Sequence, residues 1–334
     1  MMGPTRRPTV ARRPFRLTSV DSPLMDVDAP SPLRQRARAL LPEALRHPTV
    51  LALLRRSVAE DVDPDGTWQP GAFPPAEGDV TSRATLPENT VLDGRLVAKE
   101  RGVVAGLPLA RALFAMVDEQ LTLDAAVDEG DRVDPGQVVA RVSGPGRALL
   151  TAERPALNLA GRLSGIATLT RRFVEAVAHT EAHILDTRKT LPGARRPNKY
   201  AVRQGGGHNH RLGLFDMVLI KDNHIDGTGG ITAALRRVRD AYGDQYPVEV
   251  EVKTLDELTE ALAAEPDLIL LDNMDVPTLR RAVEQADGQV PLEASGGVTL
   301  DTVAAIAETG VDRISVGALT HSASTLDLSI RTDT

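Results

Sequence analysis

The stretch VEVEVKTLDELTEALAAEPDLILLDN, residues 248–273, contains a valine-rich run, an amphipathic helical segment and a second apolar run. The outer parts have the aliphatic composition of buried strands, and the middle part repeats apolar residues at the spacing of one helix face. A strand, a helix and a second strand in this order predict two parallel strands joined by a crossover helix.

Apolar runs of the same kind recur along the C-terminal half at intervals of roughly 20 to 30 residues. They are separated by helical stretches such as ITAALRRVRDAYG and TLDTVAAIAETG. A long strand–helix alternation without a dinucleotide-binding glycine fingerprint favours an α/β barrel over a doubly wound sheet. The remaining runs are HILDTRKT (183–190), MVLIKDNH (217–224), PLEASGG (291–297) and RISVGA (313–318).

The N-terminal half has a different sequence pattern. Residues 31–56 read as helical pieces broken by Pro42 and Pro48, residues 61–79 are rich in proline, glycine and acids, and residues 90–150 form a small α+β pattern. A long helical segment, AERPALNLAGRLSGIATLTRRFVEAVA, follows, and Pro155 suits its first turn. We therefore expect an α/β domain over residues 31–150 and a barrel domain over 151–321.

The first twenty residues contain five arginines and no acid. Such a segment resembles an organelle-targeting peptide, but composition alone is weak evidence. A disordered tail, or a chain whose true start is Met25, is the simpler interpretation. We exclude residues 1–30 from the expected fold.

Composition excludes several classes of protein. The 334 residues include no cysteine, which rules out disulfides, thiolate catalysis and cysteine-ligated zinc. No apolar run approaches the roughly 20 residues that span a bilayer, so we expect no membrane association and a cytoplasmic location. The formal net charge of −7 argues against a general nucleic-acid binder.

Most of the predicted barrel strands begin with apolar residues and end with polar ones. In a parallel barrel the carboxyl ends of the strands share one rim, where active sites are built. A single polar residue there would be a solvated strand end, but repetition in successive strands is hard to explain in that way. The residues are Arg188, Lys189, Lys221, Asp222, Glu251, Lys253, Asp272, Asn273, Ser295, Gly296, Gly297 and Gly317.

The segment from Asp186 to His224 is strongly cationic. It has eight lysines or arginines against three aspartates, a net charge of +5, so an anionic small ligand is the simple inference. Ser295-Gly296-Gly297 and Gly317 follow the last two strands, and we expect their backbone N–H groups near helix N-termini to hold a phosphate. A tight turn is the alternative for the glycines taken alone.

Two carboxylates, Glu251 and Asp272, end neighbouring strands. They suit Mg²⁺ bound to a polyphosphate, or the hydroxyls of a sugar that develops positive charge at C1. A structural ion pair with Lys221 or Lys253 is the alternative.

Two histidines lie close together in the cationic segment. His208 and His210 are two residues apart, which is the wrong spacing for one helical face, so we do not expect a histidine metal site. We interpret both as polar loop residues, with His210 and Arg211 facing an anion.

Several motifs in a fixed order resemble the quinolinate phosphoribosyltransferase (carboxylating nicotinate-nucleotide pyrophosphorylase) family of NAD synthesis. They are TAERPALNLAGRLSGIATLT, DTRKTLPGARRPNKYAVRQGGGHNHRLGL, LIKDNHI, VEVEV, LLDN, EASGG and VGALTHS, and the resemblance reaches back through VVAGLPLA and GDVTS. It implies an N-terminal α/β sandwich domain, completed by about residues 322–334, and an open α/β barrel that lacks part of its ring.

The resemblance also implies a reaction and an assembly. Quinolinate and phosphoribosyl pyrophosphate (PRPP) would give nicotinate mononucleotide, pyrophosphate and CO₂, with Mg²⁺ and no organic cofactor. Family members work as dimers in which one sandwich domain covers the partner's barrel mouth, and a hexamer is the larger alternative.

Residue roles follow from the motifs. The implied quinolinate group is Arg188, Lys189, His210 and Arg211, with Arg154 lent by the neighbouring subunit. The implied PRPP group is Lys221, Glu251, Asp272, Ser295, Gly296, Gly297, Gly317 and His321. Among these, Lys189, Lys221, Glu251 and Asp272 are the expected catalytic residues, and the two acids are the candidate Mg²⁺ sites, directly or through PRPP.

This chemistry accounts for the cationic segment. Quinolinate is a dianion and PRPP a polyanion, and arginine forks pair best with carboxylates. Departure of pyrophosphate leaves a cationic ribosyl centre, which Glu251 and Asp272 can stabilise before the pyridine nitrogen attacks. The positive ring nitrogen then stabilises the carbanion that remains when the adjacent carboxylate leaves as CO₂.

Two features depart from the family pattern, and three other functions stay open. Residues 61–79 are longer than the compact turn expected there, and Lys253 stands where an acid or a neutral residue is common. The alternatives are a related phosphoribosyltransferase for another acidic heterocycle, a Schiff-base aldolase-like barrel using Lys189 or Lys221, and a non-catalytic anion-binding protein. The last leaves Glu251 and Asp272 unexplained.

Overall fold

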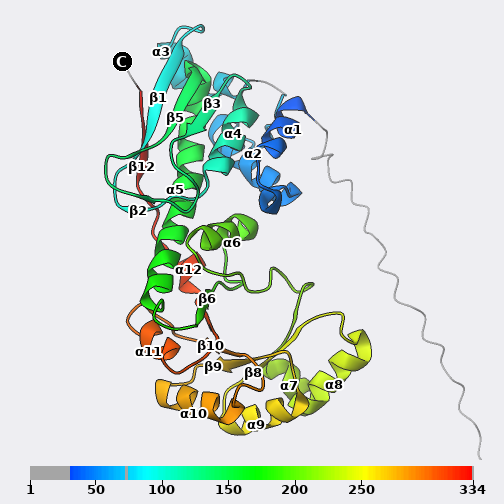
Figure 1. Cartoon of the computed structure of the whole chain (residues 1–334). Helices are drawn as coiled ribbons and strands as arrows, with labels where there is room; N and C mark the ends of the chain where they lie inside the picture. The colour runs from blue at the N-terminus through cyan, green and yellow to red at the C-terminus, as the bar shows by residue number, and fades with distance from the viewer. Residues whose placement is uncertain (1–30, 72–73, 333–334) are drawn as a thin grey trace, which may run out of the picture.

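The computed structural model describes residues 31–71 and 74–332. The tail expected over residues 1–30 lies outside the described residues. An antiparallel sheet with its helices and a parallel sheet with its helices are joined by the long helix α5 (Gly146–Ala176) (Figure 1). The expected α/β fold, with an N-terminal α/β sandwich domain and an open α/β barrel, is confirmed, and the sheet of the N-terminal domain is antiparallel.

The antiparallel sheet is built from both ends of the chain. Its four strands lie in the order β12-β1-β5-β3. Strand β12 pairs with β1 and brings the C-terminal segment beside the N-terminal one. The other elements of this half are α1 (Pro32–Ala39), α2 (Pro48–Val62), α3 (Val80–Thr85), β1 (Val91–Ala98), β2 (Gly102–Val103), α4 (Leu107–Val117), β3 (Thr122–Ala125), β4 (Arg132–Val133) and β5 (Val138–Pro145), and β12 spans Leu328–Thr332.

Prolines and one buried tryptophan organise the first helices. Pro42 and Pro48 separate α1 from α2, since proline does not fit a helix interior but suits a first turn. In the longer segment after α2, Trp68 is 2% exposed and its carbonyl accepts a hydrogen bond from Arg55 Nη1 at 2.8 Å. This part of the extra segment is therefore anchored to α2.

The predicted first-turn position of Pro155 is wrong. Helix α5 begins at Gly146, so Pro155 lies in its interior. The preceding turns join the helix because Ala148, Leu149 and Ala152 are good helix formers whose side chains are buried. Helix α5 therefore also runs without a break through the domain boundary that we expect at residues 150/151.

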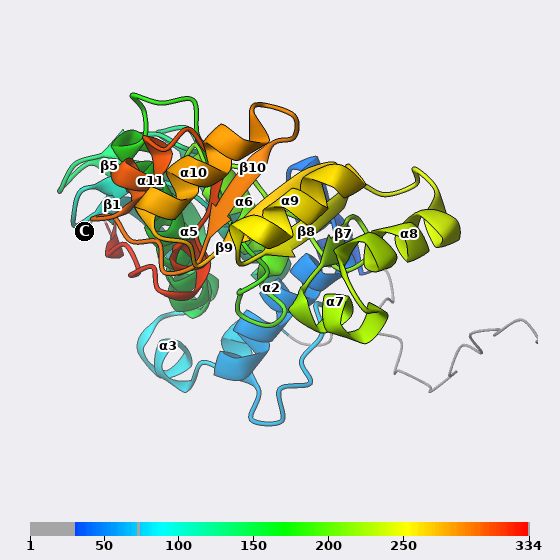
Figure 2. The ribbon, with the colours of Figure 1, turned by 90° about the horizontal axis from the view of Figure 1, so that it is seen from below.

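The parallel sheet has six strands in the order β6-β11-β10-β9-β8-β7. Within residues 31–71 and 74–332, β6 and β7 do not pair with each other, so the barrel is open. Helices α9 and α10 cover the outer face of the sheet (Figure 2). The elements are β6 (His183–Leu185), α6 (Arg195–Gln204), β7 (Val218–Ile220), α7 (Asp222–Thr228), α8 (Ile231–Tyr242), β8 (Val248–Val252), α9 (Leu255–Ala264), β9 (Leu268–Asp272), α10 (Val276–Ala286), β10 (Leu292–Ser295), α11 (Val303–Ala307), β11 (Arg313–Ser315) and α12 (Ala318–His321).

Helix α6 is fixed against both halves of the molecule. The Glu129 carboxylate accepts hydrogen bonds from the backbone N–H groups of Gly106 and Leu107, each at 2.8 Å, where α4 begins. The Tyr200 hydroxyl of α6 also hydrogen-bonds to Glu129. On the other side, Leu185 of β6 forms a parallel bridge with His208, beyond the end of α6. The cationic segment is thus built into the edge of the barrel.

The helices of the described chain include none with the length and apolarity needed to cross a membrane.

Candidate active site

The carboxyl ends of the parallel strands form a pocket. Strand register places Asp272, Ser295 and Ser315 side by side, and places Glu251 beside Leu270, two residues deeper. The pocket has a volume of about 400 Å³. Its lining combines most of the predicted site: Thr187, Arg188, Lys189, His210, Arg211, Leu219, Lys221, Glu251, Leu270, Asp272, Glu293, Ser295 and Ser315.

One wall of the pocket is cationic. Arg211 is oriented by a hydrogen bond from its Nη1 to the Met217 carbonyl at 3.1 Å. Burial and the neighbouring positive charge of Arg188 both lower the pKa of Arg211. Two guanidinium groups that repel each other in a partly buried wall favour a bound anion between them.

The two predicted carboxylates also line the pocket. Glu251 is 9% exposed and forms an ion pair with Lys221, and Asp272 Oδ2 accepts a hydrogen bond from Asn273 Nδ2 at 2.9 Å. The ion pair that we considered as an alternative is therefore present, in the pocket. Lys253, by contrast, binds Asp222 at 2.7 Å.

Glycines bring the backbone close to the side chains of Asn273, Lys189 and His321. Gly296 and Gly297 have φ values of 99° and 58°, and a Cβ on Gly296 would lie 2.1 Å from Asn273 Oδ1. A Cβ on Gly317 would lie 3.1 Å from both His321 Nε2 and Lys189 Cδ, so these three residues are neighbours.

Of the two helix N-termini that we expected near the glycines, one is found. Helix α12 begins directly after Gly317, although it has only four residues, whereas α11 begins only at Val303. At Gly296 and Gly297 the pocket therefore offers backbone N–H groups rather than a helix N-terminus.

A buried ion pair supports the cationic wall from behind. Lys199 binds Asp186, which is fully buried, and Lys199 Nζ also donates to the His210 carbonyl at 2.8 Å. Asp186 Oδ1 accepts from the His210 backbone N–H at 2.9 Å. Burial raises the pKa of Asp186 to about 6 despite the adjacent lysine. The backbone of His210 is therefore held at two atoms.

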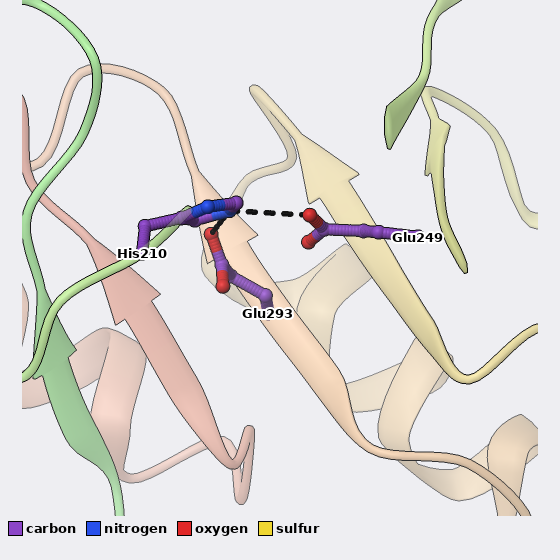
Figure 3. Close-up of side chains that lie close together, drawn as sticks. All are labelled: His210, Glu249 and Glu293. Carbon is purple, nitrogen blue, oxygen red and sulfur yellow. Dashed lines mark ion pairs between the residues drawn. The ribbon is translucent and has the colours of Figure 1, made fainter. Parts of the chain in front are cut away.

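The side chain of His210 lies between two fully buried glutamates (Figure 3). Its Nε2 is 3.1 Å from Glu249 Oε2 and 3.4 Å from Glu293 Oε1. Burial alone would lower the pKa of His210, but the contacts with both glutamates outweigh burial and raise it to about 9. We call His210, Glu249 and Glu293 the His–Glu–Glu cluster.

Sequence reasoning missed Glu249 and Glu293. The signal available was the alternation in VEVEV, which puts Glu249 on the same side of β8 as Glu251. The other histidine of the pair, His208, packs against His183, with ring centroids 4.5 Å apart, instead of joining the cluster. Arg154 is exposed on α5 and does not line the pocket of its own chain.

Comparison with known proteins gives a consistent result. Residues 79–164 match the model for the quinolinate phosphoribosyl transferase N-terminal domain, and residues 166–331 match the model for the C-terminal domain. The nicotinate-nucleotide pyrophosphorylase [carboxylating] of Mycobacterium leprae is 48% identical over 260 residues, which cover 75% of this chain and 90% of that protein. A probable enzyme of the same name from Bacillus subtilis is 44% identical over 253 residues, covering 76% and 87%.

Solved structures agree. The nicotinate-nucleotide pyrophosphorylase of Francisella tularensis superposes with a TM-score of 0.79 at 37% identity, covering 88% of this chain and all of that one. Both domain models, the sequence identities and the fold thus agree, and the chain belongs to the quinolinate phosphoribosyl transferase family.

Proposed function

We propose that this protein transfers the phosphoribosyl group of PRPP to quinolinate and releases pyrophosphate, CO₂ and nicotinate mononucleotide. The observation that carries the proposal is one pocket whose lining combines two arginines with two carboxylates, Glu251 and Asp272. The relatives' names, which describe nicotinate-nucleotide pyrophosphorylases, agree with it.

The cationic wall is suited to the substrate anions. Arg188 and Arg211 would pair with the two carboxylates of quinolinate, whose charges offset the repulsion between the guanidinium groups. Lys189 lies between this wall and Gly317 and His321, where the 5′-phosphate of PRPP would bind.

The carboxylates act on charge that develops during the reaction. As pyrophosphate leaves, positive charge grows on the ribosyl C1 carbon, and Glu251 and Asp272 stabilise it from a partly desolvated wall. Lys221 holds Glu251 in place and can approach the leaving pyrophosphate. Ser295 and the backbone of Gly296 and Gly297 hold the phosphate side.

Mg²⁺ fits this pocket as a companion of the pyrophosphate group. Oxygen ligands suit Mg²⁺, and Asp272 offers a carboxylate oxygen beyond the one bound by Asn273, whereas Glu251 is engaged by Lys221. The ion would neutralise charge on the leaving group. No organic cofactor is required for this reaction.

The active site is proposed to be shared in a homodimer. Arg154 is exposed at α5, outside its own pocket, as a residue lent to a partner would be. We also propose a cytoplasmic location. The arginine-rich first twenty residues are the feature that would favour an organelle instead.

The test is direct. Purified protein with quinolinate, PRPP and Mg²⁺ should produce equal amounts of nicotinate mononucleotide, pyrophosphate and CO₂. Absence of nicotinate mononucleotide would refute the function, and borohydride trapping of a carbonyl substrate on Lys189 or Lys221 would support an aldolase instead.

A further inference from the structure

Decarboxylation of the ring requires a proton, and none of the roles above supplies it. When the carboxylate on carbon 2 leaves as CO₂, the electron pair of the broken bond stays on carbon 2. A proton must then form the new C–H bond of nicotinate mononucleotide. The assignment of a proton donor rests on the proposed function.

The two carboxylates of the His–Glu–Glu cluster have few hydrogen-bond donors. Glu249 and Glu293 are both 0% exposed, and apart from the His210 imidazole no described residue donates to either carboxylate. Two bare carboxylates around one neutral imidazole would place two uncompensated negative charges in a buried site, at a cost of several kcal/mol. The cluster therefore retains one proton beyond that of the neutral imidazole, and His210 and the two glutamates share it.

The cluster could in principle hold a cation, because its three ligand atoms lie within 4.8 Å of one another. The hydrogen bonding argues otherwise. The backbone N–H of Arg211 donates to His210 Nδ1 at 2.7 Å, so Nε2 is the nitrogen that carries hydrogen, and it points at Glu249 and Glu293. A metal ligand would need a free lone pair on that atom.

The cluster opens onto the substrate pocket at the right place. His210 and Glu293 line the same pocket as Arg188 and Arg211, whereas Glu249 is not part of its lining. Guanidinium groups do not release protons, Lys221 is paired with Glu251, and Lys189 lies beside Gly317, on the proposed phosphate side of the pocket. Among the described residues that line the pocket, the cluster is therefore the proton-holding group next to Arg211, at the proposed carboxylate subsite.

We infer that the His–Glu–Glu cluster donates the proton that carbon 2 takes up as CO₂ leaves. The carbon–carbon bond breaks, its electron pair accepts the proton from the pocket-facing edge formed by His210 and Glu293, and CO₂ departs before it can add back. The cluster regains a proton from solvent once the product has left.

The test separates the two halves of the reaction. In single turnovers with quinolinate, PRPP and Mg²⁺, the isosteric Glu293→Gln variant should release CO₂ about 100-fold more slowly, since general acid catalysis is worth roughly 10²- to 10⁴-fold. Pyrophosphate release should slow less than about tenfold. The undecarboxylated quinolinate mononucleotide should then accumulate, visible by mass spectrometry, and Glu249→Gln should act in the same direction.

Two controls distinguish a proton donor from a structural contact. In wild type, deuterated water should slow CO₂ release and leave pyrophosphate release unchanged. Glu308→Gln removes the carboxylate from a surface pair, His179–Glu308 at 3.2 Å, and should change neither step. A thermal melt checks that each variant is folded.

The inference is overturned if CO₂ and pyrophosphate release slow together, or if neither changes in folded Glu293→Gln and Glu249→Gln proteins. A stoichiometric metal ion in wild type that is lost in Glu293→Gln would overturn it as well, in favour of a cation site. Failure of wild type to make nicotinate mononucleotide at all would refute the proposed function instead.

Discussion

Removing the buried lysine behind the cationic wall should loosen that wall locally. Lys199→Met leaves Asp186, which is fully buried, with the His210 backbone N–H and the Asn209 amide but without its cation. Breaking a buried ion pair by removing one partner costs about 3–5 kcal/mol. Because each 1.4 kcal/mol is a factor of ten, the local opening equilibrium should rise roughly 100- to 3,000-fold.

Amide hydrogen exchange measured by mass spectrometry reports this opening directly. Peptides covering residues 183–211 should lose protection by that factor. The matched control is Lys253→Met, which breaks a lysine–aspartate pair that is 47% exposed on both sides and should leave this protection nearly unchanged, because exposed pairs contribute little to stability. Protection in Lys199→Met within about threefold of wild type would refute the reasoning.

The effect should depend on pH in a defined direction. Burial raises the pKa of Asp186 from its ordinary value of 3.8 to about 6. The carboxyl group therefore contributes fully to the stability of the fold below pH 3.8, and this contribution is lost as the pH rises through about 6. Without Lys199 the Asp186 carboxyl group stays protonated to higher pH, because the positive charge of the lysine lowers the pKa of Asp186. The deficit of Lys199→Met should therefore be smaller at pH 5 than at pH 8.

Three further predictions concern the reaction. Glu251→Ala and Asp272→Ala should each lower kcat by about 10²- to 10³-fold with little change in the KM for quinolinate, since both act on transition-state charge; an unchanged kcat would mean that they are structural. Nicotinate, which lacks the second carboxylate, should be used at least about 10³-fold less well than quinolinate because Arg188 or Arg211 would stay unpaired, and comparable turnover would refute this. Arg154→Ala and Glu251→Ala chains, each nearly inactive alone, should regain about a quarter of wild-type activity when mixed, because half of randomly assorted dimers are mixed and each mixed dimer has one intact site. Tagged heterodimers without recovered activity would show that Arg154 acts within its own chain.

The fold was largely predictable because local pattern and tertiary structure agree. Each apolar run of the C-terminal half became a strand of the parallel sheet, in the order that short right-handed connections allow. The start of α5 was missed because the rule for Pro155 considers only the helix around it. Burial of Ala148 and Leu149 against the N-terminal half extends the helix past that proline, and a local rule has no access to that packing.

The rim residues were predictable for a different reason. Polar residues at the carboxyl ends of parallel strands have one common location, so Arg188, Lys221, Glu251 and Asp272 could be placed in one pocket before any coordinates were known. The Lys199–Asp186 pair could not, since the two residues belong to different elements, and only the packing of α6 beside β6 brings them together.

The His–Glu–Glu cluster shows why the deeper part of the site cannot be predicted from the polar residues at the strand ends. Glu249 and Glu251 share one side of β8, but two residues of rise place Glu251 nearer the rim and Glu249 a layer below it. Glu293 lies in register with Leu270, in the same row as Glu251, and reaches His210 across the barrel interior. In the sequence each of the two cluster glutamates is an acid inside an apolar run that predicts a buried strand. Such an acid is tolerated only when a partner is fixed opposite it, and here that partner is an imidazole whose backbone is already held by Asp186 and Lys199. The substrate wall and the proposed proton donor therefore depend on the same buried contacts, so variants that loosen this support should impair quinolinate binding and CO₂ release together, whereas Glu293→Gln should separate them.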